Sequence, residues 1–528
     1  MTSTAEIRIA PPSTVGRPTT DVARSSSLAP WVLGLIASVV ASLGSWIPSL
    51  WGDEAASVLS ATRPIGSLFA MLTHVDAVHG TYYFGLHWWI AVFGASPFSV
   101  RMPPAIAVGL AVVAVVLLVR RLADPRTALV GGVICILLPR FTYMGEETRS
   151  YAFSAAVVAW AMLLLVDLVS GRRGGRRWWV LYGVLIAVGV YIFMYTALLL
   201  VAHAILLAAV RAPRRTWRSW LIAAVVGVSA AGPVVVFSVL ERSQIAFLST
   251  ETTTDFTSLA VGLWFWTWWY ALIAWALIVG GVASWSAGLI RARRRAARVA
   301  PGSDAARSAR VPSLELVGLV WLAVPGVILL LSNIPFADFT GRYLSMSAPG
   351  AGLLMAAGVR ALAALPWRTA RVRGLVAVLL VVGVSVAALP SWVSQRTLYA
   401  KNQSDWAEIS TAVGAHASPG GAVVFDESTR PSKRPRLALH TYPAGFRGLT
   451  DVTLSVPYTR SPTWYDRELT VPQALADGRF RGYREVWLIE YSTGKTTDTY
   501  GLADLEKAGY RVSATYRTHR SEILELRD

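Results

Sequence analysis

Long apolar runs alternate with short polar segments along most of the chain. A helix needs roughly twenty mostly apolar residues to cross the hydrocarbon core of a bilayer. Runs of this kind occupy residues 29–50, 103–119, 128–143, 151–169, 219–239, 260–290, 313–332, 345–365 and 374–391. The stretch 178–210 is long enough to cross twice, with a turn near 193–197. The pattern therefore predicts an α-helical polytopic membrane protein with about eleven transmembrane helices.

Arginine content differs between the loops on the two sides of these predicted helices. If the N-terminus lies inside, the internal loops that collect arginine are 120–126, 172–177, 211–218, 291–310 and 360–373. The loops on the other side carry only scattered arginines. Because cytoplasmic loops are enriched in Lys and Arg, this bias predicts a multi-pass plasma-membrane (inner-membrane) protein with a cytoplasmic N-terminus and an outer C-terminus.

The same pattern divides the chain into three parts. Residues 1–28 are polar and rich in Ser and Pro, which predicts a disordered cytoplasmic tail. Residues 29–395 form the transmembrane domain, within which 51–102 is the first external loop. In that loop, 81–94 is too short to span, and its Trp, Tyr and His residues predict an interfacial helix. Charged residues become frequent after this domain, so 396–528 is predicted to be a soluble extracytoplasmic domain.

This last part alternates between strand and helix patterns. Runs rich in β-branched and aromatic residues predict strands at 421–427, 484–491, 511–517 and 521–527. Helices are predicted at 404–417, with Ser404 as the N-cap, and at 502–510. The predicted fold class is thus a helical membrane protein with a C-terminal α/β domain.

Composition excludes several classes of function. Hydrophobic residues make up 54% of the chain and charged residues only 15%, which excludes a soluble protein. The formal net charge of +18 would suggest nucleic acid, but the arginines lie in loops between apolar runs, so no nucleic-acid partner is expected. The single cysteine, Cys135, excludes intramolecular disulfides and cysteine-based zinc sites. The sequence contains no nucleotide-binding motif, which argues against an ATP-driven pump.

Acidic and basic side chains gather in the predicted external segments. Asp53 and Glu54 follow the first apolar run, and Arg149 and Arg342 lie in later external segments. Arginine binds phosphate oxygens through a fork of N–H donors and stays charged at the membrane boundary. A carboxylate can orient an attacking hydroxyl and accept its proton. This combination favours a reaction between a lipid-borne phosphate donor and a hydroxyl at the outer face.

Four motifs, in order, resemble a known family. They are "GDE" (52–54), "HGTYYF…FGASPFSVRMPPA" (79–105), "ETRSY" (147–151) and "GRYLS…P" (341–349). The set resembles the GT-C membrane glycosyltransferases, in particular family 39, which includes the protein O-mannosyltransferases and the aminoarabinose transferase of lipid A. The resemblance covers roughly residues 30–390. One motif departs from the family, because members often have His-Pro-Pro where this chain has His-Gly-Thr.

The resemblance implies a polyprenyl-phosphate sugar donor, transfer at the external face and inversion at the anomeric carbon. The implied sugar is mannose or a related pentose. Asp53 matches the catalytic base of the family and Glu54 its second acidic position. Arg149, Arg342 and Tyr343 match positions that hold the donor phosphate. Further donor or acceptor contacts are expected from His74, Asp76, His79, Tyr82 and Glu147.

Each candidate also has a simpler structural interpretation. Asp53 could cap the helix that follows the first apolar run, and the arginines could extend to the membrane interface without a ligand. His74, Asp76 and His79 have a loose metal-like spacing, but we interpret them as a solvated loop. We therefore predict no metal site and no cofactor besides the lipid-linked donor substrate.

The expected acceptor is a hydroxyl of a cell-envelope glycan, a lipoglycan or a protein. The composition, rich in Ala, Val and Arg and poor in Lys, resembles proteins of high-GC actinobacteria, which favours an actinobacterial cell-envelope mannosyltransferase. The alternative for the whole chain is a multipass flippase or carrier of lipid-linked glycans with an external glycan-binding domain.

Overall fold

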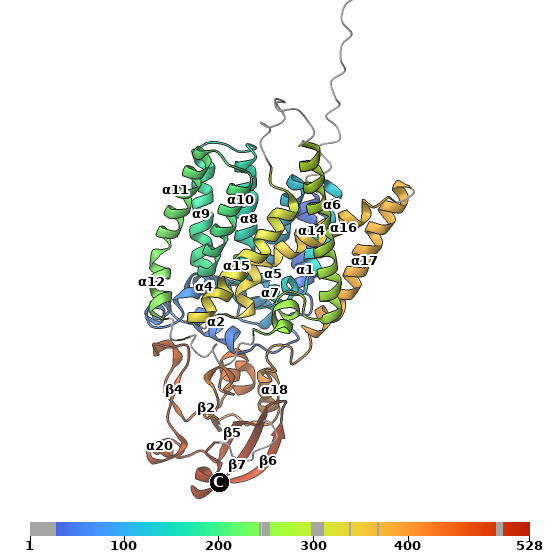
Figure 1. The fold of residues 1–528 in the computed structure, drawn as a ribbon. Coiled ribbons are helices and arrows are strands. Elements are labelled where there is room, and N and C mark those ends of the chain that lie inside the picture. Colours follow the sequence, from blue (N-terminus) through green and yellow to red (C-terminus); the bar gives the residue numbers. More distant parts are fainter. Residues whose placement is uncertain are drawn as a thin grey trace, which may run out of the picture.

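The computed structural model of the chain describes residues 28–241, 244, 254–296, 311–336, 339–366, 369–492 and 500–528. The predicted tail at 1–28 lies outside the described residues except for Leu28, as does most of the predicted loop at 291–310. The chain has a helical part and, at one end of it, a part built around a β-sheet (Figure 1).

The helical part contains most of the chain's α-helices. They are α1 (Ala29–Ser42), α2 (Gly52–Thr62), α3 (Ile65–Leu72), α4 (Gly80–Phe93), α5 (Pro97–Leu122), α6 (Pro125–Leu137), α7 (Pro139–Gly145), α8 (Tyr151–Val169), α9 (Arg176–Ile192), α10 (Leu199–Ala209), α11 (Arg214–Ala230), α12 (Gly232–Leu240), α14 (Trp268–Ala296), α15 (Leu314–Phe336), α16 (Ala348–Ala363) and α17 (Ala370–Ser394). Short irregular helical turns connect several of them, namely η2 (Ala77–His79), η3 (Met194–Leu198), η5 (Ser258–Gly262) and η7 (Gly341–Ser347).

Within the described residues, six helical segments are long and apolar enough to cross a membrane. They are α5, α8, α14, α15, α17 and the segment that joins η7 to α16. The number rises to eight if each of the bent pairs α6–α7 and α11–α12 is one span; the bends are 57° and 56°. These segments coincide with apolar runs predicted from the sequence, which confirms a multi-pass membrane protein. The count of eleven crossings and the orientation stay predictions.

The stretch 178–210 contains two helices, α9 and α10, which are separated by η3 close to the predicted turn. The predicted interfacial helix at 81–94 corresponds to α4, which has 14 residues and is not among the candidate spans. The helix pair in 178–210 and the short helix at 81–94 thus both follow the apolar pattern of the sequence.

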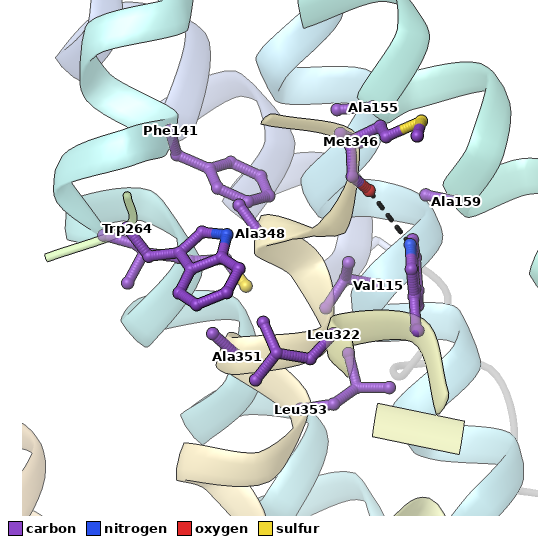
Figure 2. Close-up of a cluster of buried hydrophobic side chains, with 14 of the residues drawn as sticks. Val115, Phe141, Ala155, Ala159, Trp264, Leu322, Met346, Ala348, Ala351 and Leu353 are labelled. Carbon is purple, nitrogen blue, oxygen red and sulfur yellow. Dashed lines mark hydrogen bonds between the residues drawn. The ribbon is translucent and has the colours of Figure 1, made fainter. Parts of the chain in front are cut away.

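A large apolar cluster fixes the segment that carries Arg342. Residues of this cluster labelled in Figure 2 include Val115, Ala155, Leu322, Met346 and Leu353. The indole N–H of Trp321 in α15 donates a 2.9 Å hydrogen bond to the carbonyl oxygen of Met346 in η7. Because both partners are buried, this bond ties η7 to the helices behind it. The position of Arg342 is therefore set by the packed core.

The C-terminal part is a five-stranded mixed sheet with the strand order β2-β1-β5-β7-β6. Its strands are β1 (Ala422–Phe425), β2 (Thr450–Asp451), β5 (Glu485–Tyr491), β6 (Arg511–Arg517) and β7 (Ser521–Arg527). The strands β3 (Leu454–Val456) and β4 (Arg467–Glu468) form a separate antiparallel pair. β1 is parallel to β2 and β5, whereas β7 is antiparallel to β5 and β6. The helices of this part are α18 (Trp406–His416), α19 (Leu437–Thr441), α20 (Val471–Ala476) and α21 (Leu502–Lys507).

All four strands predicted in the C-terminal part are present, and the sheet confirms a C-terminal α/β region. The very short strands β2, β3 and β4 were not predicted, because two or three residues carry no alternating pattern. The N-cap prediction for Ser404 was wrong, since Asp405 occupies that position in α18. The Ser404 hydroxyl instead donates a 2.7 Å hydrogen bond to the Leu50 carbonyl oxygen.

Helix α2 packs against the sheet part and shares its apolar core. Ala55 and Leu59 of α2 belong to the same buried cluster as Trp406 and Trp487. Figure 1 shows α2 at the junction between the two parts. A Cβ atom at Gly52 would lie 2.5 Å from the carbonyl oxygen of Ser432, so only glycine allows this close approach. The sheet part therefore positions the helix whose first turn carries Asp53 and Glu54.

Candidate active site

Asp53 lies in the first turn of α2 and contacts two arginines from distant segments. Its Oδ2 atom accepts a hydrogen bond from Nη1 of Arg342 and lies 3.7 Å from Nη2 of Arg149. The side chains of Asp53 and Arg342 are 20% and 22% exposed, so the pair is reachable from outside. The capping interpretation of Asp53 is wrong, because Trp51 is the N-cap residue and no side chain makes a capping hydrogen bond.

The two arginines keep N–H donors that Asp53 does not use. Nη1 of Arg149 donates to the hydroxyl of Tyr83 at 2.8 Å. Within the described part of the chain, the buried Nε atoms of Arg149 and Arg342 have no hydrogen-bond acceptor. Buried donors without an acceptor are costly and rare in proteins. The site therefore combines positive charge with vacant donors, which suits an anionic ligand.

Glu54, the neighbour of Asp53, points away from this cluster into the protein. Its carboxylate accepts hydrogen bonds from Nε and Nη2 of Arg101 at 2.8 and 2.5 Å, and from the backbone N–H of Thr148 at 3.0 Å. Both Glu54 and Arg101 are completely buried. Burial raises the pKa of Glu54, but Arg101 more than offsets this and holds the pKa below its usual value. The two acidic positions predicted from the family motif are therefore separated, because Glu54 does not join Asp53 at the arginines and instead anchors the segment that carries Arg149.

Asp76 lies on the other side of Arg149, close to the sheet part. It accepts a hydrogen bond from the hydroxyl of Tyr83, and its Oδ2 lies 3.8 Å from Nη1 of Arg149. The indole N–H of Trp464 donates to the same oxygen at 3.3 Å. Burial raises the pKa of Asp76, and Arg149 partly offsets the rise. Asp76 therefore connects Tyr83 and Arg149 to Trp464, a residue of the sheet part.

Arg63 fixes the loop that carries Trp464. The Arg63 side chain is buried and donates to the carbonyl oxygens of Ser461, at 2.9 Å, and Thr463. The Ser67 hydroxyl donates to the carbonyl oxygen of Thr459 in the same loop, at 2.5 Å. The sheet part is thus attached to α2 and α3 beside the site.

The two predicted histidines lie in different environments. His79 is buried, with Nδ1 3.0 Å from the hydroxyl of Ser150, and burial together with the nearby charge of Arg149 holds its pKa well below its usual value. His74 is exposed and its Nδ1 contacts the carbonyl oxygen of Ala70 at 3.0 Å, so the structure does not bring His74 to the site. Among the residues that the structure describes, no group of three His, Cys, Asp or Glu side chains could hold a metal ion.

The remaining predicted residues surround the cluster. Tyr343 stacks on Tyr195 with ring centroids 5.1 Å apart. Glu147 is buried, which raises its pKa, and its Oε1 has no hydrogen-bond partner in the described chain. Tyr82 lines an apolar groove of about 420 Å³, formed with Trp89, Ile106 and Phe153. The residue after Tyr82, Tyr83, accepts a hydrogen bond from Arg149.

Sequence reasoning missed three residues of the site. Arg101 is a charged residue near the start of the apolar helix α5. A charge in such a helix requires a partner of opposite charge, and this requirement could have indicated the pairing of Arg101 with Glu54. Tyr83 follows Tyr82 in the motif at 79–105, and its place in that motif is the signal that points to it. Trp464 gave no signal, because it lies 388 residues from Asp76 along the chain.

Comparison with known proteins agrees with this architecture. A family model described as dolichyl-phosphate-mannose-protein mannosyltransferase matches residues 82–239, which include Arg149 but neither Asp53 nor Arg342. No curated protein matches the chain. Similar solved structures include ArnT from Cupriavidus metallidurans bound to undecaprenyl phosphate, with a TM-score of 0.54 and 14% identity over 94% of this chain and 98% of that chain. The apo state of ArnT gives a TM-score of 0.52 and 12% identity over 94% and 97% of the two chains.

At these identities the similarity to ArnT is one of fold. The chain therefore has the fold of ArnT, and residues 82–239 match the family model of the dolichyl-phosphate-mannose-protein mannosyltransferases.

Proposed function

We propose that the chain is an inverting glycosyltransferase that moves a sugar from a polyprenyl-phosphate donor to a hydroxyl acceptor at the external membrane face. The observation that carries the proposal is the convergence of Arg149 and Arg342 on Asp53, each arginine with a buried Nε–H that lacks an acceptor. A phosphate group offers the oxygen acceptors that these donors lack. The carboxylate between them offers a proton acceptor at the same place.

Donor binding would change the partners of Asp53. Without a ligand, its carboxylate neutralises part of the charge of Arg149 and Arg342. A donor phosphate would compete for the same guanidinium groups, because arginine binds phosphate through several N–H donors at once. Asp53 would then be released from the arginines and free to accept a hydrogen bond from the acceptor hydroxyl.

Transfer would follow as a direct displacement. The acceptor oxygen forms a bond to the anomeric carbon while the bond from that carbon to the phosphate oxygen breaks, which inverts the configuration. The hydroxyl proton passes to Asp53, and the electron pair of the broken bond leaves with polyprenyl phosphate. Arg149 and Arg342 stabilise the negative charge that develops on the departing phosphate.

Other features support the two substrates. The apolar groove beside Tyr82 suits the lipid chain of a donor that stays in the membrane, and ArnT was solved with undecaprenyl phosphate bound. The description of the matching family model favours mannose as the sugar. Trp464 approaches Asp76 from the sheet part, which favours an acceptor that arrives from that side, such as a cell-envelope glycan, a lipoglycan or a protein.

The donor site is tested by changing Arg342. We expect Arg342→Ala to weaken binding of a polyprenyl-phosphate sugar by roughly 10- to 100-fold, because it removes a charge-assisted hydrogen bond to phosphate. Arg342→Lys should recover part of the loss, since it keeps the charge but not the planar fork. The measurement is donor affinity and initial transfer rate with purified protein in lipid nanodiscs.

Arg218→Ala is the matched control for this experiment, because Arg218 is exposed and lies near the start of α11, far from Asp53 along the chain. Unchanged donor affinity in Arg342→Ala would contradict the phosphate assignment. Movement of lipid-linked sugar across the bilayer without any transfer to acceptor would favour the carrier alternative.

A further inference from the structure

A second groove lies between α9 and α11, away from the site of Asp53. It has a volume of about 810 Å³. Figure 1 shows the two helices side by side at one edge of the helical part, with α12, which follows α11, near the sheet. The first turns of α9 and α11 therefore lie at the end of the helical part opposite the sheet. The groove follows both helices from these first turns, reaching Ala187 on α9 and Ala230 on α11.

Basic side chains line only one end of this groove. Arg173, in the loop before α9, lines it together with Arg176 at the start of α9 and Arg215 at the start of α11. Arg173 already pairs with Asp167 at 3.2 Å. Arg176 and Arg215 are exposed, and neither forms an ion pair with a carboxylate of the described residues. This end therefore carries positive charge that no carboxylate of the described residues neutralises.

The rest of the groove is apolar and open at the surface of the helical part. Its walls include Val180, Val184, Ile222 and Val226, all of which are exposed large hydrophobic residues. Its floor is formed where the helices pack closely, since a Cβ at Gly227 would lie 2.6 Å from the carbonyl oxygen of Gly183. From Arg215 to Ala230 the groove extends roughly 22 Å along α11, more than one leaflet of a bilayer whose core is about 30 Å thick.

We propose that this groove binds one anionic phospholipid, with the phosphate at Arg176 and Arg215 and an acyl chain along the apolar walls. Charge complementarity selects the headgroup, because the arginines offer several N–H donors and positive charge at one end only. Thr216 and Ser219 also line the groove close to the charged end, and each has a hydroxyl group that can donate to a headgroup. Trp179 lines the same end, and its ring is of the kind that lies at the membrane–water interface.

The test uses the full-length protein in detergent micelles titrated with phosphatidylglycerol or phosphatidylcholine, and native mass spectrometry counts the bound lipids. We expect one phosphatidylglycerol to bind at concentrations where phosphatidylcholine does not. The double variant R176Q/R215Q should lower the apparent affinity about 10- to 30-fold. The matched control R177Q/R218Q removes the same charge from the same helices outside the groove and should lower it less than about threefold. Val184→Trp should also reduce binding, because it fills the groove without changing charge.

Several results would overturn the proposal. Equal binding of phosphatidylglycerol and phosphatidylcholine would remove the headgroup argument, and equal losses in the two double variants would reduce the effect to general surface charge. Displacement of the lipid by an equal concentration of glycerol phosphate would mean that the apolar walls take no part. A dimer that Val184→Trp dissociates, without any bound lipid, would assign the groove to a second copy of the chain.

Discussion

Asp53→Asn is expected to lower the rate of sugar transfer by about two to four orders of magnitude while leaving donor binding intact. Asparagine keeps the size of the side chain but cannot accept the proton of the acceptor hydroxyl. An alcohol holds its proton tightly, so the carboxylate receives it late, when the sugar already carries positive charge and the attacking oxygen has become acidic. The measurement is single-turnover transfer with saturating polyprenyl-phosphate sugar.

The donor affinity of this variant separates catalysis from a purely structural role. In the proposed mechanism Asp53 competes with the donor phosphate for Arg149 and Arg342, so its neutralisation should leave donor affinity equal to that of the parent or raise it. Asp504→Asn is the control, since Asp504 lies in α21 and its ion pair with Lys507 is mostly exposed. A folded Asp53→Asn protein with near-normal transfer would contradict the assignment of Asp53 as the base.

The sequence predicted the helices of the membrane part because an apolar run of sufficient length has few alternatives to a spanning helix. The run 151–169 and helix α8 agree residue for residue. The run 29–50 is longer than α1, which ends at Ser42, because Gly44 adopts a positive φ of 73° and Pro48 follows. Apolar content alone does not detect such breaks, although the residues that cause them are visible in the sequence.

The arrangement of the candidate site was only partly predictable. Motif order identified Asp53, Arg149 and Arg342, and the structure brings these three together. The order of the motifs could not show which of the two adjacent carboxylates faces the cluster. Successive residues of a helix point in directions about 100° apart, so only one of the two can face it. That rotation turns Glu54 toward Arg101 while Asp53 faces the two arginines. The contribution of the sheet part required the tertiary fold.

We expect Glu54→Gln to lower the free energy of unfolding by about 3–5 kcal/mol, because it leaves the buried charge of Arg101 without a counter-ion. The glutamine amide would also place an NH₂ group against the N–H donors of Arg101 and Thr148, to which Glu54 now offers acceptors. The measurement is equilibrium unfolding of the purified protein in detergent near pH 7. Glu506→Gln is the matched control, since Glu506 is exposed in α21, and it should change stability by less than about 0.5 kcal/mol.

The same pair predicts a dependence on pH. Folding holds the pKa of Glu54 below its reference value of 4.5, because Arg101 outweighs the effect of burial. A carboxyl group of this kind contributes stability above its unfolded pKa, and the contribution disappears as the pH falls through the folded value. The parent and Glu54→Gln should therefore differ most in their free energy of unfolding near neutral pH. This difference should decrease as the pH falls below 4.5.

A double-mutant cycle with Arg101→Met shows whether the two side chains act as a pair. Arg101 also donates to the carbonyl oxygens of Ser45 and Pro48, so its loss has a cost of its own. The double variant should nevertheless be less destabilised than the sum of the single variants, because the ion pair is lost only once. Additive effects, with a cost below about 1 kcal/mol for Glu54→Gln, would contradict the anchoring role. Glu54 also accepts a hydrogen bond from the backbone N–H of Thr148, the residue before Arg149. Glu54→Gln should therefore lower both the transfer rate and the stability of the protein. Asp53→Asn should lower the transfer rate alone.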